Sequence, residues 1–415
     1  MTKKTFDITS QLKGLFGDNS ESDFKIRVSN ISDTLFSIAK ENAGKKFDLV
    51  FNESDYLKFG KIVTSALKRA CAEFSTLLIE EKSFDHSKNK SFFQFSGEIV
   101  IVVGSYDLIS ITSYYASLKN KETYVVLTEP SAEYLLIDKA RIPANGLHVL
   151  VDSVKPKAII IDLDILNKAP IKCFQESFIN VMSKLLTLID YKFRVLITGE
   201  QFDLLSYQNI KNAISIVASI NTYENRKDVL IYAELVLAVE RKRASALLDG
   251  AVELYQEALG LFSSSIYKGD RLLTSMRVIG ELYEMLFTND LGNLLSVADY
   301  NQDIEFLEKT TGKSGNYFRK NLNVPSPKRI EIINKIIRKT RIGFAKEVES
   351  VLYVLSAIEK VYNSFCKKDE TQEKLPFNTK REALLVATYL SDKVTILSHM
   401  RDMGVLKCVN ANYTK

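Results

Sequence analysis

The side chains best suited to metal or acid–base chemistry are few in this chain of 415 residues. The chain has three histidines, His86, His148 and His399, and none lies between residues 149 and 398. Imidazole is the commonest metal ligand in proteins and the side chain that most readily exchanges protons near neutral pH. The four cysteines are far apart and form no CxxC pair, so no zinc knuckle is indicated. Residues 149–398 therefore offer no imidazole to hold a catalytic metal.

Two carboxylates, Asp162 and Asp164, follow a run of apolar residues and are two positions apart. On a strand such a pair shares one face and is suited to acid–base work. We favour the alternative, in which they cap a helix or form hydrogen bonds at a domain junction. The sequence Gly312-Lys313-Ser314 is similar to the end of a phosphate-binding loop, but Leu307 stands where that pattern requires glycine, which predicts an ordinary loop.

Small residues at two predicted strand ends are the best candidates for contacts with a phosphorylated ligand. Gly104 and Ser105 end one apolar run, and Thr128 and Ser131 lie at the end of the next. Backbone N–H groups at a helix N-terminus bind phosphate, and glycine allows a close approach because it has no Cβ. We expect these four residues to contact a cofactor. For Ser131, capping of a helix is an equally good interpretation.

The elements that would position these residues alternate between strand and helix. Apolar runs at 47–52, 98–103, 123–128 and 157–163 predict buried strands, and helical periodicity follows at 62–74 and from residue 107. This alternation predicts a doubly wound α/β domain over residues 46–168. Residues 1–45 are polar and are expected to form an extension with one amphipathic helix near 31–39.

Residues 169–415 are expected to form an all-helical domain, because apolar residues recur there at helical spacing. The segments are 178–191, 230–239, 244–262, 272–287, 330–342, 344–365 and 379–403. The exception is the strand-like piece Val195-Leu196-Ile197, which we cannot place.

The composition indicates a globular protein, with 46% hydrophobic and 26% charged residues and a net charge of +5. No apolar run is long enough to span a bilayer, and the N-terminus lacks the apolar segment of a signal peptide, so we expect a cytoplasmic protein. Basic residues gather at 241–243 and 328–341, where a solvated helix face is favoured over a binding patch, and no nucleic-acid motif is found. A homo-oligomer is compatible with the sequence.

Several segments, in order along the chain, resemble the glycerol-1-phosphate dehydrogenase-like family, which belongs with dehydroquinate synthase and the iron-containing alcohol dehydrogenases. They are residues 103–116 (VGSYDLISITSYYA), 156–170 (PKAIIIDLDILNKAP), 182–192 (MSKLLTLIDYK) and 394–406 (VTILSHMRDMGVL). The resemblance implies an α/β nucleotide-binding (Rossmann-like) N-terminal domain followed by an all-α C-terminal domain. It also implies NAD(P) as cofactor and cofactor contacts at Gly104, Ser105, Thr128 and Ser131.

The chain departs from this family at the glycine-rich turn. Tyr106 occupies the next small position after Ser105, and Ser110 and Ser113 stand where the family pattern has Asp and Lys. A phenol there either blocks the path of the cofactor phosphates or stacks on a ligand, and blocking is the favoured interpretation.

The chain departs further at the metal site, to which the family contributes one Asp and two His. The matching positions are Asn180 for the Asp, Tyr283 for the first His, and the neighbourhood of residues 291–292 for the second. An uncharged amide and a phenol are poor substitutes for a carboxylate and an imidazole. A bound metal is therefore not expected.

The sequence leads to three hypotheses. The first is a divergent, catalytically degenerate relative of the glycerol-1-phosphate dehydrogenases, a pseudoenzyme that binds a nucleotide, a small phosphorylated metabolite or a protein partner. The second is an active NAD(P)-dependent oxidoreductase acting on a polyol phosphate such as glycerol 1-phosphate or dihydroxyacetone phosphate, with Lys184, Tyr283 or a metal held differently polarising the substrate oxygen. The third, a basic nucleic-acid-binding or scaffold protein, lacks a motif and ranks last.

Overall fold

The computed structural model describes residues 3–16, 25–80, 93–144, 147–263, 265–288, 298–366 and 376–406. The chain divides into two compact units. An α/β unit contains residues 1–177 and 219–242, and a helical unit contains residues 178–218 and 243–415. The expected fold class, an α/β nucleotide-binding-like unit followed by a helical one, is confirmed. The chain leaves the α/β unit and later returns to it, whereas we expected a single boundary at residue 168.

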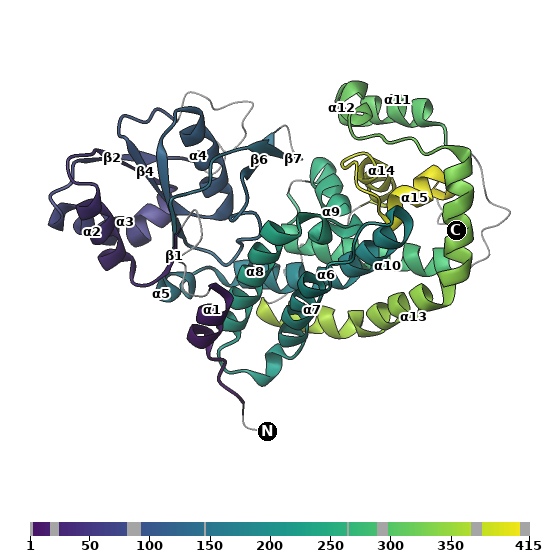
Figure 1. Ribbon diagram of the computed structural model, residues 1–415, viewed down its shortest axis with the longest axis horizontal. Helices are drawn as coiled ribbons and strands as arrows, with labels where there is room; N and C mark the ends of the chain where they lie inside the picture. The colour runs from purple at the N-terminus through teal and green to yellow at the C-terminus, as the bar shows by residue number, and fades with distance from the viewer. Residues whose placement is uncertain are drawn as a thin grey trace. The chain divides into compact units, whose positions relative to one another are not determined.

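A six-stranded parallel sheet forms the centre of the α/β unit, in the order β1-β8-β5-β4-β2-β3 (Figure 1). Its strands are Lys25–Val28 (β1), Phe47–Phe51 (β2), Phe74–Leu78 (β3), Ile99–Gly104 (β4), Glu122–Leu127 (β5) and Ala158–Ile161 (β8). Every residue of β2, β4 and β8 is buried, as expected for parallel strands covered on both faces. A separate antiparallel hairpin consists of Lys139–Ala144 (β6) and Leu147–Asp152 (β7).

Helices cover the two faces of this sheet. Helices α2 (Ile31–Glu41) and α3 (Glu53–Arg69) pack against alternate residues of the strands. That core includes Leu35 and Ile38 from α2, Phe59 and Val63 from α3, and Phe47, Leu49, Phe51, Ile99, Ile101 and Val103 from the strands. Helix α4 (Tyr106–Leu118) contacts β4 and β5, and its buried residues lie outside this core, so it covers the other face.

The N-terminal residues are part of the α/β unit. Strand β1 pairs in parallel with β8 at the edge of the sheet, and the amphipathic helix expected near residues 31–39 is α2. Before them, α1 (Ile8–Phe16) follows a segment in which the backbone of Phe6 donates to and accepts from the Asn225 amide, both at 2.8 Å. The chain start and the returning segment are thus held to each other.

The returning segment ends in α8 (Arg226–Arg243), most of which is buried. Asp228 near its start accepts a hydrogen bond from the Asn167 amide at 3.1 Å. At its other end the guanidinium of Arg241 forms a buried ion pair with Glu133 and lies 4.4 Å from the ring centre of Tyr134. This buried pair explains part of the basic stretch 241–243 as structural.

The helical unit consists of helices of different lengths, in keeping with the all-helical pattern of its sequence (Figure 1). They are α7 (Leu204–Ala218), α9 (Ala251–Phe262), α10 (Lys268–Thr288), α11 (Tyr300–Thr311), α12 (Gly315–Arg319), α13 (Pro327–Phe365), α14 (Phe377–Ala387) and α15 (Ile396–Asp402), with most of α6 (Ile171–Thr198). Shorter 3-10 turns are Ile220–Thr222 and Ser245–Leu248. Among the described helices, none combines the length and the apolar character needed to cross a bilayer.

Three sequence-based assignments need correction. The strand-like piece Val195-Leu196-Ile197 lies in the last turn of α6, which ends at Thr198 and is followed by Gly199 with a φ of +73°. Three apolar residues at the end of a long helical pattern continue the helix rather than begin a strand. Residues 330–342 and 344–365 form one helix, α13, and residues 379–403 form two, α14 and α15, because Thr395 caps a new helix start.

Residues with positive φ end two further helices. The helical pattern read as far as residue 74 stops at Arg69, because Cys71 has a φ of +57° and Phe74 opens β3. Gly312 ends α11 with a φ of +67°, and Ser314 caps α12. The stretch around Lys313 is therefore an ordinary connection between helices, as the sequence predicted.

The structural role favoured for Asp162 yields a test of the fold. The carboxylate of Asp162 is buried and accepts from the backbone N–H of Ile31 at 2.9 Å, of Asp164 at 3.0 Å and of Ile165 at 3.3 Å. We expect Asp162→Ala to lower the free energy of unfolding by about 2–4 kcal/mol, because buried N–H groups lose their acceptor. Asp164→Ala, at an exposed neighbour, is expected to change it by about 0.5 kcal/mol or less. Urea unfolding of both variants measures this, and equal losses would contradict the assignment.

Candidate functional site

The order of the strands places a topological switch point between β2 and β4. From β2 the chain passes through α3 to β3 on one side, and from β4 it passes through α4 to β5 on the other. Ligands of doubly wound sheets bind at the carboxyl ends of the strands at such a point. The residues at this edge are the candidate ligand site of the α/β unit.

Three of the four predicted cofactor residues meet at this edge. Gly104 ends β4, and its carbonyl accepts from the N–H of Thr128 at 3.2 Å. Ser105 caps α4, with its hydroxyl 3.5 Å from the N–H of Leu108. A Cβ on Gly104 would lie 2.7 Å from the end of the Leu108 side chain, which would have to shift to make room for it.

Ser131 does not cap a helix in the described residues. It is followed by turns, and the next regular element is β6. The capping interpretation is therefore wrong for this residue, and its role in ligand contact stays a prediction.

Two carboxylates lie at the same edge, and the sequence reasoning missed both. Asp55, in the first turn of α3, is buried, and its Oδ2 accepts from the Thr128 hydroxyl at 3.3 Å. Oε1 of Glu129 accepts from the backbone N–H of Tyr106 at 3.0 Å, at the N-terminus of α4. An internal carboxylate thus occupies a position where the resemblance would place a cofactor phosphate.

The environment of Glu129 is acidic, and its side chain is partly buried. Burial raises the pKa of Glu129 to about 7, with a further contribution from the charge of Glu176, while the hydrogen bond from Tyr106 lowers it. The thiol of Cys173 lies 3.5 Å from Oε2, and burial likewise raises its pKa. The Glu129 carboxyl is therefore more readily protonated than an ordinary exposed glutamate.

Tyr106 is buried beside this turn. Its hydroxyl accepts from Ser110 at 3.3 Å, and its ring centre is 6.2 Å from that of Tyr134. Burial raises the pKa of the phenol, which stays neutral. The phenol therefore packs inside the α/β unit.

The positions that the sequence analysis matched to the metal ligands of the resembling family lie in the helical unit, where Tyr283 takes part in a hydrogen-bond network. Tyr283 of α10 is fully buried, and its hydroxyl donates to Oδ1 of Asp190 in α6 at 2.7 Å. Asp190 also accepts from the backbone N–H of Ala251 at 2.8 Å and of Ile396 at 2.9 Å. Burial raises the pKa of Asp190 to about 6, against the effect of these three donors.

The neighbouring polar side chains are also engaged. Lys184, which has no exposed side-chain surface, forms an ion pair with Glu253 at 2.7 Å. The Thr187 hydroxyl is 3.2 Å from both oxygens of Glu253, and the N–H of Gly250 donates to Oε2. Asn180 is partly exposed on α6, and residues 291–292 lie outside the described part of the chain.

These residues do not fit a divalent metal. The phenol of Tyr283 already donates to Asp190, and an amide stands at 180. Within the described residues, no group of three or more His, Cys, Asp or Glu side chains has the arrangement of a metal site. The other histidines belong elsewhere: His148 lies 3.9 Å from Asp107, and buried His399, with its pKa lowered to about 4 by burial, is 3.2 Å from the Asn334 amide. His86 lies outside the described residues.

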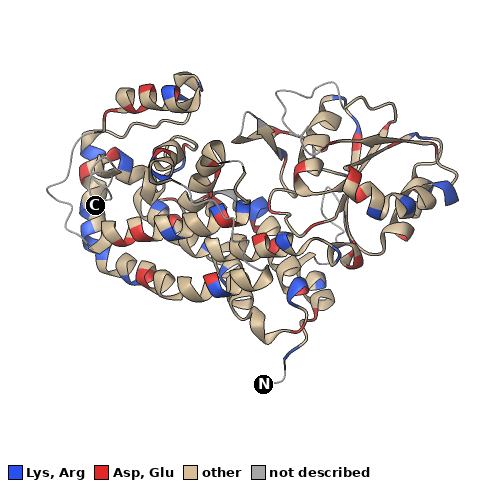
Figure 2. Ribbon diagram, turned by 180° about the vertical axis from the view of Figure 1, so that it is seen from behind, with Lys and Arg blue, Asp and Glu red and all other residues tan. Residues whose placement is uncertain are grey.

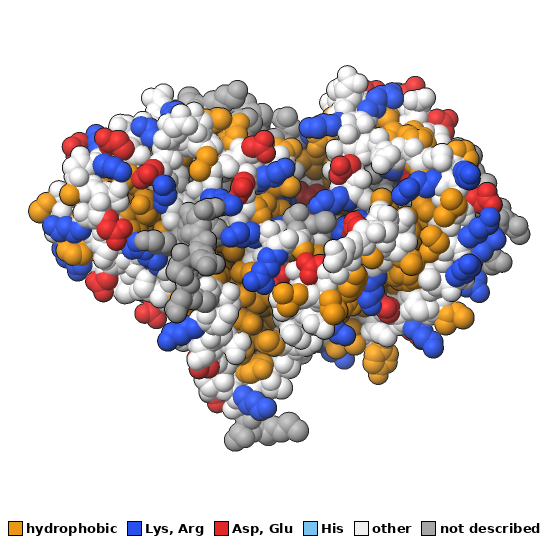
Figure 3. Space-filling view, viewed as in Figure 1, with side chains coloured by type: hydrophobic (Ala, Val, Ile, Leu, Met, Phe, Trp, Pro, Cys, Tyr) orange, Lys and Arg blue, Asp and Glu red, His pale blue; other side chains and the backbone are white. Residues whose placement is uncertain are grey.

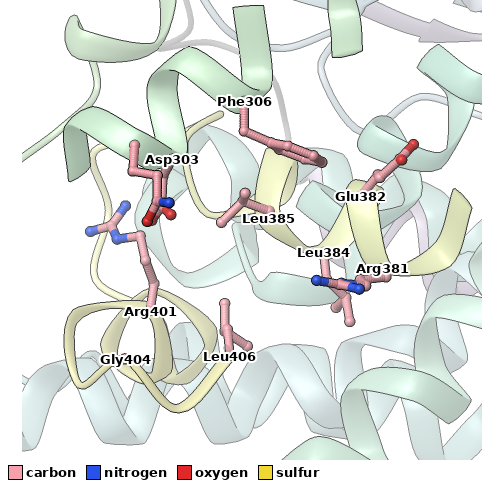
Figure 4. A pocket seen from close by; sticks show the side chains of 10 residues that line it. Asp303, Phe306, Arg381, Glu382, Leu384, Leu385, Arg401, Gly404 and Leu406 are labelled. Atoms are coloured by element: carbon pink, nitrogen blue, oxygen red, sulfur yellow. The ribbon is translucent and has the colours of Figure 1, made fainter. Parts of the chain in front are cut away.

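A pocket of about 350 Å³ lies within the helical unit, lined by residues of α11, α14, α15 and the turn that follows α15 (Figure 4). Leu384, Leu385, Leu406 and Phe306 line it, with charged side chains at its two ends. Its buried charges have internal partners: Arg401 binds Asp402, and Asp303 accepts from the Tyr389 hydroxyl at 3.1 Å. These contacts stabilise the last helices.

Comparison with known proteins gives the class. No family model matches the chain. Solved structures share the fold over nearly the whole chain. An archaeal alcohol dehydrogenase from a Red Sea brine pool has a TM-score of 0.58, 13% identity and coverage of 94% of this chain and 97% of its own. An iron-containing alcohol dehydrogenase from Thermococcus thioreducens has a TM-score of 0.55, 12% identity and coverage of 92% and 97%. The fold is that of the iron-containing alcohol dehydrogenases.

Sequence similarity points to one branch of this group. The glycerol-1-phosphate dehydrogenase of Thermoplasma volcanium is 22% identical over 182 residues, which are 42% of this chain and 52% of the relative. That of Metallosphaera sedula is 26% identical over 132 residues, 31% of this chain and 38% of the relative. The chain thus matches about half or less of the length of these relatives. It is a divergent relative of the glycerol-1-phosphate dehydrogenases, as its motifs predicted.

The raised pKa of Glu129 predicts a pH dependence of stability. A carboxyl whose pKa is about 7 in the folded chain and 4.5 in the unfolded chain stabilises the fold fully below pH 4.5, and this contribution is lost as the pH rises through 7. We expect Glu129→Gln to remove a decline of the order of 1–3 kcal/mol over this interval. Chemical unfolding across the range measures it. If stability changes with pH in the same way in the variant and in the unsubstituted chain, Glu129 is not the cause of the decline.

The hydrogen bond from Tyr283 to Asp190 predicts an unequal effect of two Tyr→Phe substitutions. Tyr283→Phe leaves a buried carboxylate without one of its donors and is expected to cost about 1.5–3 kcal/mol, the range for hydrogen bonds to charged groups. Tyr255, equally buried, donates to the carbonyl of Lys380 at 3.1 Å, so Tyr255→Phe should cost about 1 kcal/mol. Denaturation curves of the two variants give their free energies of unfolding. If Tyr283→Phe lowers this free energy no more than Tyr255→Phe does, the proposed strength of the Tyr283–Asp190 hydrogen bond is wrong.

Proposed function

We propose that this chain is a catalytically degenerate relative of the glycerol-1-phosphate dehydrogenases. It binds a nucleotide or a small phosphorylated metabolite in the α/β unit and does not carry out metal-assisted hydride transfer. The main support is the pair Tyr283–Asp190, because the side chain at the position of an expected metal ligand donates a buried hydrogen bond within the helical unit. The absence of histidine between residues 149 and 398 supports the same conclusion.

The proposed ligand site is the edge formed by Gly104, Ser105 and Thr128, with Ser131 in the following turn. Glu129 makes this edge unfavourable for a fully charged pyrophosphate, because its carboxylate already accepts the Tyr106 N–H. A ligand phosphate at this helix N-terminus has to displace that carboxyl group. NAD(P) is therefore expected to bind weakly, and more strongly when Glu129 is protonated.

A screen of the full chain with nucleotides and metals tests the proposal. We expect NAD(P) or ADP to raise the midpoint of thermal unfolding more at about pH 6 than at about pH 8, because the pKa of Glu129 lies near 7. Glu129→Gln is expected to tighten nucleotide binding by about tenfold and to weaken its pH dependence, since a like charge is removed. Glu80→Gln, at an exposed carboxylate, is the matched control and should bind as the unsubstituted chain does.

Turnover separates this proposal from an active polyol-phosphate dehydrogenase. We expect no oxidation of NAD(P)H with dihydroxyacetone phosphate and no stoichiometric zinc by elemental analysis. Oxidation that a chelator abolishes would refute the proposal and establish the second hypothesis. Lack of stabilisation by every nucleotide at both pH values would refute the ligand site alone.

A further inference from the structure

One face of α13 carries a regular stripe of lysine and isoleucine. Starting at residue 328, the stripe consists of Lys328, Ile332, Lys335, Lys339, Ile342 and Lys346, all exposed. Their spacing of four, three, four, three and four residues keeps them on one side of an α-helix. The opposite side packs into the helical unit through Ile333, Ile337, Phe344 and Val348, which are buried. The stripe is therefore the outward face of the helix.

This face has a strong positive charge. Residues 327–346 contain seven basic residues and one acidic residue, Glu331. Glu331 pairs with Lys335 at 2.7 Å, and both side chains are 66% exposed. In the described part of the chain, Lys328, Lys339 and Lys346 take part in no ion pair. Figure 2 marks basic positions in blue along the ribbon of α13, and Figure 3 shows basic side chains on the surface of this part of the helical unit.

Two large apolar side chains interrupt the charges. Ile332 is 49% exposed and Ile342 is 70% exposed, and Tyr353, two turns beyond Lys346, is 85% exposed. Contact with water or with nucleic-acid phosphates does not stabilise exposed aliphatic side chains. They gain from insertion among lipid acyl chains, while the lysines between them reach the headgroups.

We propose that this lysine–isoleucine stripe of α13 docks the protein on the surface of an anionic lipid membrane. The lysines supply attraction to the negative headgroups, and Ile332 and Ile342 enter the boundary between headgroups and acyl chains. The attraction of each basic residue to such a surface adds to that of the next and weakens as salt screens it. The helix lies on the surface and does not span the bilayer.

Sedimentation of the full chain with lipid vesicles tests the proposal. Vesicles of phosphatidylcholine mixed with phosphatidylglycerol are expected to bind the chain, and vesicles of phosphatidylcholine alone are not. Replacing Lys328, Lys335, Lys339 and Lys346 together by glutamine should weaken partitioning by about 100-fold or more. The double substitution Ile332→Ser and Ile342→Ser should also weaken partitioning onto the vesicles. The binding that remains should depend more strongly on salt concentration, because it relies on the lysines alone.

A matched control removes the same charge elsewhere. Lys61, Lys68, Lys211 and Lys309 are exposed lysines of other helices, and their replacement by glutamine should leave vesicle binding unchanged. Thermal unfolding of each variant verifies that it folds. Absence of binding to anionic vesicles, an equal loss in the control, or retention of duplex DNA or RNA by the stripe in place of vesicles would each overturn the proposal.

Discussion

The α/β unit depends on parallel pairing of β2, β4 and β5, which brings the carboxyl ends of three strands to one edge of the sheet. Such an edge collects polar groups that the chain must satisfy, either with a ligand or from within. Here Asp55 accepts from Thr128, and Glu129 accepts from the first N–H of α4. The chain thus supplies its own anion to a helix terminus, and a ligand there competes with an internal group.

The helical unit uses one buried carboxylate in a comparable way. Asp190 receives hydrogen bonds from Tyr283 and from the backbone at the starts of α9 and α15, so a single side chain joins elements that are distant in sequence. The start of α9 lies close against α6, because a Cβ on Gly250 would lie 3.1 Å from Asp190 and 3.0 Å from Thr187. The Lys184–Glu253 ion pair lies beside it. Tyr283, the position matched to a family metal ligand in the sequence analysis, is thus part of a packed hydrogen-bond network.

The sequence predicted what depends on local pattern. Strands β2, β4, β5 and β8 are predominantly apolar runs, and the turn at Gly104 follows from its residue types. Strand β3 was not predicted because it is half exposed and closely follows a helix. The hairpin of β6 and β7 was not predicted because its register depends on tertiary contacts. Glu129 and Asp190 looked like ordinary polar residues. Their roles arise from donors up to 206 positions away, which no local spacing reveals.

The return of the chain to the α/β unit at residues 219–242 has a consequence for synthesis in the cell. The bonds between Phe6 and Asn225, and between Glu133 and Arg241, join residues that leave the ribosome far apart in time. Until α8 has been synthesised, the N-terminal part of the α/β unit therefore lacks these contacts, and the surface that α8 covers stays exposed. A fragment that ends at residue 177 lacks Asn225 and α8, and therefore both of these contacts.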